Sequence, residues 1–234
     1  LILQPSKELK VLQRWLLRNI FAYFPVSEYS SAYSKGNSVR KNAAVHREGR
    51  YLLHTDITNF FPTISRTMLK QYFQSNESLM RKLGMADEDI ELILDICLYR
   101  GENLVVGSVA SPQIANMLMY AFDLELKQML DGFGSFRYTR YADDIVISSM
   151  SFIDEQVLKQ TEQLMIKYGF KMNHEKTYYM GKNGKRQVTG IVLDNNRNAL
   201  TIGNKKYKKF QRMLYDYLVK GHGDLGYIKG YLAY

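Results

Sequence analysis

The sequence predicts an α+β fold in which helices cover one sheet of short strands. Apolar runs of strand length, at residues 51–56 and 136–149, alternate along the chain with segments of helical periodicity. Strands and helices interleaved around one sheet are typical of an α+β sandwich. The 234 residues are 46% hydrophobic, which excludes a disordered chain and suffices for one or two domains with a buried core.

The first half of the chain carries mostly helical patterns around a single strand. In residues 7–24, leucines recur at helical spacing with lysine and arginine opposite them, and Pro25 ends the pattern. Ser111 followed by Pro112 is typical of a helix start. The predicted elements are helices over 7–24 and 38–46, a buried strand over 51–56, and helices from near residue 65, over 87–99 and over 111–130.

The second half begins with a predicted β-hairpin over 136–149, which turns at Ala142 and Asp143. A helix over 154–168 and a strand near 170–172 are expected next. A strand pair flanking Gly181 and Gly184 completes the predicted sheet elements.

Composition narrows the class of protein. The most apolar run, Leu92 to Tyr99, is short and contains Asp95, so no membrane span is predicted. Cys97 is the only cysteine, which excludes a disulfide framework and a CxxC zinc site and fits the reducing cytoplasm. Because the chain starts at Leu1 and stops at Tyr234 within an apolar pattern, we expect both ends to be truncated.

The formal charge of +9 is concentrated in residues 182–220, which hold ten basic residues against two acidic ones. Tyr207, Phe210, Tyr215 and Tyr217 lie among these charges. Such a pattern suits a surface that follows a phosphate backbone and offers rings to bases or sugars, although a solvated helix face is the alternative. The RNA-binding candidates in this block are Lys205, Lys206, Lys208 and Lys209.

Three carboxylates are the candidate catalytic residues. Asp143 and Asp144 lie at the hairpin turn, and Asp56 ends the other apolar strand. Carboxylates held close together need a cation, and Mg²⁺ favours carboxylate oxygens combined with substrate phosphates. This set therefore predicts a two-metal site for nucleotidyl transfer. The alternative is that the aspartate pair only forms the turn.

Four segments resemble reverse transcriptase motifs, in the order that the family has them. Residues 141–144 (YADD) look like the catalytic box, and residues 54–61 (HTDITNFF) resemble the first carboxylate motif. Residues 107–116 (GSVASPQIAN) are similar to the GxxxSPxxxN motif, and residues 169–177 resemble the loop ending in Lys-Thr. The family usually has Gln before Gly107, where this chain has Val106, which puts fidelity or substrate preference in doubt.

Two further elements resemble the bacterial retron group. Residues 42–46 fit an NAxxH pattern, and residues 188–190 fit VTG. The resemblance implies an RNA-directed DNA polymerase that copies a structured noncoding RNA, primes from a 2′-hydroxyl within it and makes RNA-linked DNA from dNTPs. It also implies phage defence beside an effector protein. Group II intron-like or other defence-associated reverse transcriptases are the near alternatives.

The implied architecture is a right-hand polymerase with fingers, a ferredoxin-like palm and the start of a thumb. Fingers would occupy residues 1–50, the palm 51–191 with finger elements inserted at about 66–105, and a basic thumb 192–234. Two rivals from other classes are a nucleotide cyclase-like palm enzyme and a noncatalytic RNA-binding relative. The cyclase would not need the SPxxxN loop, and the intact carboxylates argue against the noncatalytic relative.

The resemblance also assigns individual roles. Catalysis would rest on Asp56, Asp143 and Asp144, which hold two Mg²⁺ ions, or Mn²⁺, with help from the Ile57 carbonyl. Phe61 would pack under the incoming sugar and disfavour a 2′-hydroxyl, with Phe60 in the core. The other nucleotide-binding candidates are Lys35, Arg40, Gly107 and Lys176. The other primer, template or RNA candidates are Asn42, His46, Ser111, Pro112, Tyr141, Val188, Thr189 and Gly190. For the lysines and Arg40 the alternative is a solvated surface charge, and for His46 and Tyr141 a structural role.

Overall fold

The computed structural model describes residues 2–34, 36–195, 197 and 199–233. Its centre is a four-stranded sheet in the order β2-β3-β1-β4, with every neighbouring pair antiparallel. The strands are β1 (Tyr51–Asp56), β2 (Arg137–Tyr141), β3 (Asp144–Ser149) and β4 (Tyr178–Met180). The predicted hairpin is confirmed, since β2 and β3 pair across a two-residue turn at 142–143.

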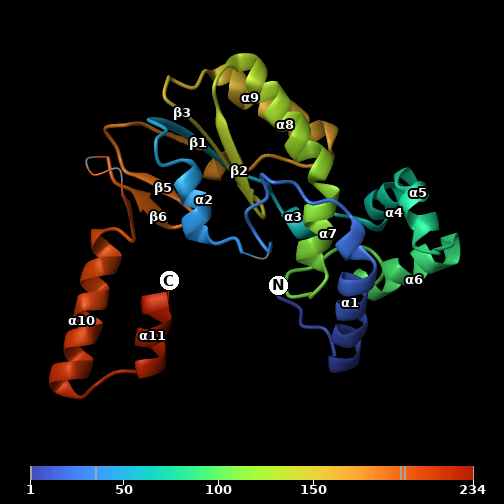
Figure 1. Cartoon of the computed structure of the whole chain (residues 1–234), viewed down its shortest axis with the longest axis horizontal. Coiled ribbons are helices and arrows are strands. Elements are labelled where there is room, and N and C mark those ends of the chain that lie inside the picture. The colour runs from blue at the N-terminus through green and yellow to red at the C-terminus, as the bar shows by residue number, and fades with distance from the viewer. Residues whose placement is uncertain (1, 35, 196, 198, 234) are drawn as a thin grey trace.

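Helices cover this sheet and build its main core. α7 (Ser111–Leu118), α8 (Tyr120–Phe133) and α9 (Glu155–Lys167) follow one another across the molecule in Figure 1. α8 buries Phe122, Leu126 and Leu130 at its apolar positions. The single helix expected over 111–130 is divided, because the backbone at Met119 closes α7 before α8 begins.

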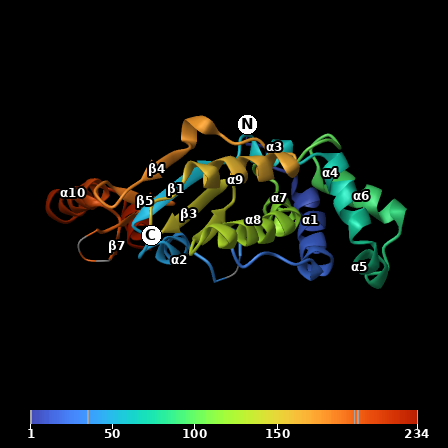
Figure 2. The ribbon, with the colours of Figure 1, turned by 90° about the horizontal axis from the view of Figure 1, so that it is seen from above.

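A helical lobe flanks the sheet on the other side of α7 (Figures 1 and 2). It contains α1 (Lys7–Asn19), η1 (Phe21–Tyr23), α3 (Phe60–Thr63), α4 (Arg66–Ser75), α5 (Glu77–Lys82) and α6 (Asp87–Cys97). The rings of Phe21 and Phe73 stack with centroids 6.3 Å apart, which joins η1 to α4. The helix predicted to reach residue 24 ends at Asn19, since Ile20 leaves the helical conformation with φ −122°.

A second sheet and α2 (Val39–Val45) form a smaller core. This sheet has the order β5-β6-β7, from β5 (Arg186–Val188), β6 (Ile191–Leu193) and β7 (Leu200–Thr201). The strands predicted around Gly181 and Gly184 exist as β4 and β5, but their pairing with each other is wrong. β4 pairs with β1 while β5 pairs with β6. Near 170–172 only an isolated bridge forms, between Met172 and Ile57, and the 3-10 helix η2 (His174–Lys176) follows.

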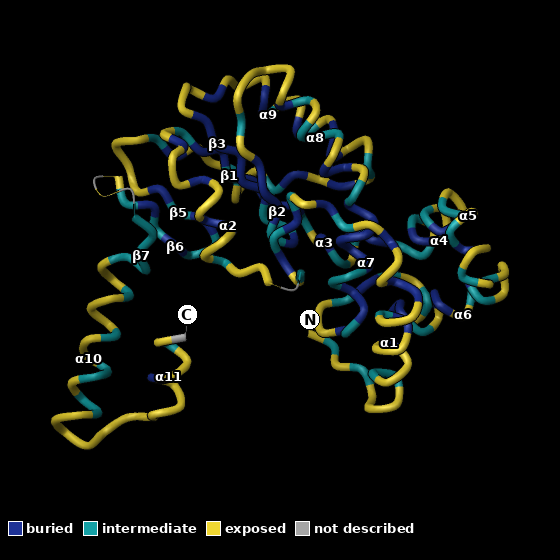
Figure 3. Tube along the Cα trace, in the orientation of Figure 1, coloured by how far each residue is buried: buried dark blue, intermediate teal, exposed yellow. Residues whose placement is uncertain are grey.

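The last two helices, α10 (Asn204–Lys220) and α11 (Leu225–Ala233), project from the second sheet as a pair. Figure 3 shows that both are largely exposed along their length, and α10 has no buried residue. The rings of Phe210 and Tyr231 stack with centroids 5.3 Å apart and hold the pair together. Within the described residues, no helix is long and apolar enough to cross a membrane.

Candidate active site

The three candidate carboxylates lie at one edge of the central sheet. Asp56 ends β1 and is the register partner of Asp144, the first residue of β3. Asp143 lies in the turn just before it, and its carbonyl accepts a hydrogen bond of 3.1 Å from the Ile57 N–H. The antiparallel pairing of β1 with β3 is what brings these residues together, because the end of one strand must meet the start of the other.

A buried ion pair supports the turn that carries Asp143. Ala142 has a φ of +59°. This conformation costs a non-glycine residue free energy, and it persists only where the surrounding structure holds it. Arg140 donates a 3.1 Å hydrogen bond to the Ala142 carbonyl. The same guanidinium binds Asp123 with both side chains fully buried, so α8 fixes the geometry of the turn.

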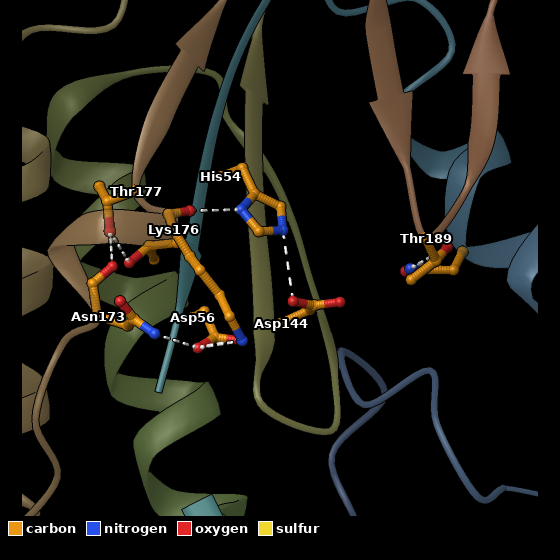
Figure 4. A network of polar contacts seen from close by, with 9 residues as sticks. His54, Asp56, Asp144, Asn173, Lys176, Thr177 and Thr189 are labelled. Atoms are coloured by element: carbon orange, nitrogen blue, oxygen red, sulfur yellow. Dashed lines mark hydrogen bonds and ion pairs between the residues drawn. The ribbon is translucent and has the colours of Figure 1, made fainter. Parts of the chain in front are cut away.

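Asp56 is neutralised by a lysine from the loop after α9 (Figure 4). Lys176 Nζ lies 3.0 and 3.1 Å from the two oxygens of Asp56, and Asn173 Nδ2 donates to the same carboxylate at 3.1 Å. The hydrogen bond to Asp56 raises the pKa of Lys176 above its ordinary value. The Asn173 N–H also donates to the Asp56 carbonyl at 2.8 Å, which fixes this loop to the end of β1.

His54 connects two parts of the site, a role that sequence reasoning missed. Its Nε2 lies 3.4 Å from Asp144 Oδ1, and its Nδ1 lies 3.0 Å from the Lys176 carbonyl oxygen. Burial opposes protonation of the ring, but the hydrogen bonds to Asp144 and Lys176 outweigh it and raise the pKa of His54. The ring also stacks on Tyr178, with centroids 4.8 Å apart. The only signal in the sequence was its position two residues before Asp56.

The donor set fits a divalent cation. Burial, followed by the charges of Asp56 and Asp144, raises the pKa of Asp143, so the three carboxylates repel one another and a cation would relieve this repulsion. Carboxylate oxygens are hard ligands of the kind that Mg²⁺ prefers. Among the described residues, however, no three such side chains are arranged as a metal-binding group. Asp56 is instead paired with the Lys176 ammonium at 3.0 Å.

An open pocket adjoins the carboxylates. Asp56, Asp143 and Lys176 line it together with Phe61 and Val106. Phe60 is buried in the main core, as expected, and its ring contacts Phe61 at a centroid distance of 5.3 Å. The structure thus brings the predicted sugar-contacting ring and the residue in place of the usual Gln to the same pocket as the catalytic candidates.

Gly107 and Arg40 are not among the described residues that line this pocket. Gly107 is needed by the backbone, because it has a φ of +103° and an added Cβ would lie 2.4 Å from the Leu3 carbonyl oxygen. Arg40 is exposed on α2, and Lys35 lies outside the described residues. Tyr141 is half-buried at the end of β2, next to the turn.

Ser111 and Pro112 begin α7, but their predicted functions receive no support from the geometry. Ser111 is buried and its hydroxyl makes no hydrogen bond within the described residues. Ala110, rather than Ser111, is the residue that precedes the helix. The Asn116 of this motif instead donates to the Ala32 carbonyl at 3.0 Å and accepts from Ser30 at 2.8 Å. The motif therefore fixes the segment at 30–32 to α7.

The two retron-like elements meet in the second core, although 147 residues separate them. Asn42 Nδ2 donates a 3.2 Å hydrogen bond to Thr189 Oγ1. The expected direct RNA contacts of Asn42, His46 and Val188 need correction, because all three are buried. His46 hydrogen-bonds Ser148 at 2.8 Å and Thr139 at 2.7 Å, and so joins α2 to two strands.

The Val188–Gly190 turn contacts the first turn of α10. Gly190 has a φ of +85°, and its carbonyl accepts a 3.4 Å hydrogen bond from Lys206. The other three candidate lysines, Lys205, Lys208 and Lys209, are exposed. Lys206 thus helps to attach α10 to the second sheet, while its three neighbours are exposed and Lys209 Nζ lies 6.0 Å from the ring centroid of Tyr227 on α11.

Comparison with known proteins identifies the class. Residues 1–193 match the family model "Reverse transcriptase (RNA-dependent DNA polymerase)", and the chain belongs to this family. Its template is therefore RNA and its product DNA, and like its family it uses a divalent metal ion. This sets aside the cyclase alternative.

The enzyme is of the retron type. It is 30% identical over its whole length to the retron Ec86 and retron Ec73 reverse transcriptases of Escherichia coli, and covers 70% and 77% of them. Telomerase structures from Candida albicans and Candida tropicalis, both with a fragment of telomeric RNA, share the fold with TM-scores of 0.52 and 0.53. They are 13% and 12% identical, and this chain spans 44% of each. The predicted polymerase fold is thereby confirmed.

Proposed function

We propose that this chain copies a structured noncoding RNA into DNA with two Mg²⁺ ions held by Asp56, Asp143 and Asp144. The observation that carries the proposal is the meeting of these carboxylates at one sheet edge, beside a pocket that also contains Phe61 and Lys176. Mn²⁺ would serve as a substitute, since it also accepts carboxylate ligands. The Ile57 carbonyl is the further oxygen that we assign to the metal site.

The reaction joins a 3′ or 2′ hydroxyl oxygen to the α-phosphorus of a dNTP and releases pyrophosphate. When held by Asp56, Asp143 and Asp144, metal ions would supply activation of the attacking hydroxyl and stabilisation of the triphosphate and leaving oxygen. Lys176, whose ammonium pairs with Asp56 in this structure, would neutralise the pyrophosphate or give it a proton. His54 contacts the Lys176 backbone at its carbonyl oxygen.

Other residues of the pocket would select and hold the nucleotide. Phe61 packs beneath the sugar and excludes a 2′-hydroxyl by its size. Arg40, together with Lys35, contacts the triphosphate, and Tyr141 packs against the primer end. Val106 places an apolar surface where the family has an amide, so we expect fewer polar contacts to the nucleotide there.

The domains follow from this assignment. We assign residues 1–50 and about 66–105 to the fingers, 51–191 to the palm, and 192–234 to the start of a basic thumb. The helical lobe, the two sheets and the projecting α10–α11 pair support this division. On the same assignment, Lys205, Lys208 and Lys209 contact RNA backbone, and Thr189 and Gly190 position RNA at the base of the thumb.

The biological setting is part of the proposal. Similarity to the retron enzymes supports priming from a 2′-hydroxyl of the cognate RNA, an RNA-linked DNA product and a phage-defence role beside an effector protein. We place the enzyme in the cytoplasm, where the buried thiol of Cys97 would stay reduced.

The test is nucleotide incorporation by Asp143→Asn and Asp144→Asn on a primed RNA with Mg²⁺. We expect incorporation to be abolished while RNA affinity changes by at most a few fold, because the basic surface supplies most of the binding. Asp87→Asn, an exposed aspartate at the start of α6, is the matched control and should keep full activity. Activity close to wild type in both active-site variants would overturn the assignment, and would favour a noncatalytic role for these carboxylates.

A further inference from the structure

A second pocket, which is basic, lies away from the catalytic carboxylates. Four cationic residues line it, and its acidic residues are Glu48 and Asp194. The cationic residues are Arg47, Arg50, Lys182 and Arg186. We call this the strand-start pocket, because Arg50 directly precedes β1 and the pocket also contacts Met150, just after β3.

The position of the pocket separates it from the active site. β1 runs six residues from Tyr51 to Asp56, and a strand rises about 3.3 Å per residue, so the two sites lie about 17 Å apart along the strand. An occupant of the strand-start pocket would not displace a nucleotide beside Asp56. The pocket is thus a separate site.

Arg186 gives the pocket a fixed, buried cation. Its side chain is held by Asn195 Oδ1 at 2.6 Å and by the carbonyl of Gly49. These acceptors are neutral, and Arg186 forms no ion pair with any described residue. Burial lowers the pKa of Arg186, but arginine stays protonated in proteins. A buried charge without a counter-ion is costly, and an anion in the pocket would offset that cost.

The acidic residues do not cancel this charge. Glu48 already pairs with Arg137 outside the pocket lining, at 2.5 Å. Asp194 Oδ1 accepts a 3.0 Å hydrogen bond from the backbone N–H of Arg197, and its carboxylate offsets one of the four positive charges. The four cations therefore leave an excess of positive charge in the pocket, which favours an oxyanion as its occupant.

The chemistry of the lining favours phosphate over a base. No aromatic ring is among the described residues that line the pocket, so a nucleobase would find no stacking partner there. The positive surface also continues beyond the pocket. Lys185, Lys205 and Lys206 line a neighbouring hollow between the second sheet and α10, and Asp194 borders both. A spaced row of cations of this kind suits a polyphosphate backbone.

We propose that Arg47, Arg50, Lys182 and Arg186 form a second RNA-contact site, which binds backbone phosphates of the template RNA outside the segment being copied. This rests on the proposed function, because it takes RNA as the polyanion. The site would hold a structured part of the RNA against the palm while the single-stranded part reaches Asp56. Contact through phosphate and shape, rather than through base edges, is the usual way to bind folded RNA.

The test compares two RNA probes. One is a short primed template, and the other is the same template joined to a long hairpin. The variant is the double substitution Arg50→Gln and Lys182→Gln, both at exposed positions, so that the buried Arg186 is left intact. The matched control is Arg81→Gln with Lys159→Gln, which removes the same charge from exposed sites on α5 and α9. Thermal unfolding checks that both variants fold.

For the hairpin-tailed RNA, we expect the variant to lower the slope of log K against log salt by about 1.4 to 1.8, which corresponds to about 25- to 60-fold weaker binding at about 0.1 M salt. Binding and extension of the short primed template should match the control. Unchanged affinity for the hairpin-tailed RNA would overturn the proposal, as would an equal loss on both probes. Competition by inorganic phosphate without any difference between the RNAs would show a free-phosphate site instead. If wild-type enzyme fails to extend either primed RNA, the proposed polymerase function fails. The difference in binding between the two RNAs still tests whether the strand-start pocket contacts RNA.

Discussion

Arg140 and Asp123 form an ion pair from which solvent is fully excluded. Arg140 Nε and Nη2 each lie 2.8 Å from one oxygen of the Asp123 carboxylate. Tyr138 donates to the same carboxylate at 2.7 Å, and the remaining nitrogen of Arg140 reaches the Ala142 carbonyl. The pair thus links the first turn of α8 to the turn that holds Asp143.

Arg140→Met should therefore destabilise the fold by about 3–5 kcal/mol, because it leaves a buried carboxylate without its partner. Urea unfolding would measure the loss. Arg81→Met is the matched control, since Arg81 pairs with Glu77 on an exposed helix face and its loss should cost less than about 1 kcal/mol. A similar, small effect of both substitutions would contradict the role given to the buried pair.

Phe61→Val should raise the incorporation of ribonucleotides relative to deoxyribonucleotides, because a smaller side chain opens space beside Asp56 in the pocket. Single-nucleotide extension with each rNTP and dNTP pair would measure the ratio. Phe60→Leu is the control: Phe60 lies in the core, so its replacement should lower stability without changing the ratio. An altered ratio for Phe60→Leu alone would show that Phe60, and not Phe61, discriminates against ribonucleotides.

The sequence located the carboxylates because strand ends are visible in an apolar pattern. Asp56 and Asp144 were each expected at the end of a strand, and antiparallel pairing then made them neighbours. The pairing of Lys176 with Asp56 was not predictable in the same way. It depends on how the loop after α9 packs over β1, a contact between residues 120 positions apart.

Burial was the other property that sequence patterns did not reveal. His46 lies in a polar, basic segment that favoured an RNA-binding surface, yet its ring is completely buried. The hydroxyls that hydrogen-bond its ring belong to Thr139 on β2 and Ser148 on β3, far along the chain. The pairing of β4 with β1 was missed for a related reason. A strand of three residues pairs with whichever strand tertiary packing places beside it, and this need not be the next strand in the sequence.

The buried His46 predicts a dependence of stability on pH. Burial, with a smaller effect of the Arg137 charge, lowers the pKa of His46 from 6.5 to about 3. Between these values the unfolded chain binds a proton that the folded chain does not, so the free energy of unfolding falls as the pH drops below about 6.5. From pH 7.5 to pH 5, this group should account for a loss of about 2 kcal/mol.

Urea unfolding of wild type and His46→Gln across this pH range would isolate that loss, because glutamine does not titrate. The difference between the two proteins should be constant above pH about 7 and should shrink by about 2 kcal/mol at pH 5. A difference between wild type and His46→Gln that stays the same at every pH would show that His46 is accessible to protons in the folded state.

Charge reversal on α10 tests whether this helix binds RNA. Lys205, Lys208 and Lys209 are exposed, whereas Lys206 donates to the Gly190 carbonyl and is kept unchanged so that the helix stays attached. Glutamate at the three exposed positions should weaken RNA binding and lower the slope of log K against log salt by about 0.7 to 0.9 for each phosphate that the helix no longer neutralises. Titrations at several salt concentrations would give this slope.

Two further measurements separate a local role of α10 from a general effect of charge. Incorporation at saturating RNA should recover much of its rate, because the carboxylates at the far end of β1 are untouched. The matched control reverses Lys82, Lys159 and Lys167, which carry the same charge at exposed positions of α5 and α9. Equal slopes for the two triple variants would mean that RNA binding depends on the overall charge of the protein and not on α10. The thumb assignment would then rest on family membership alone.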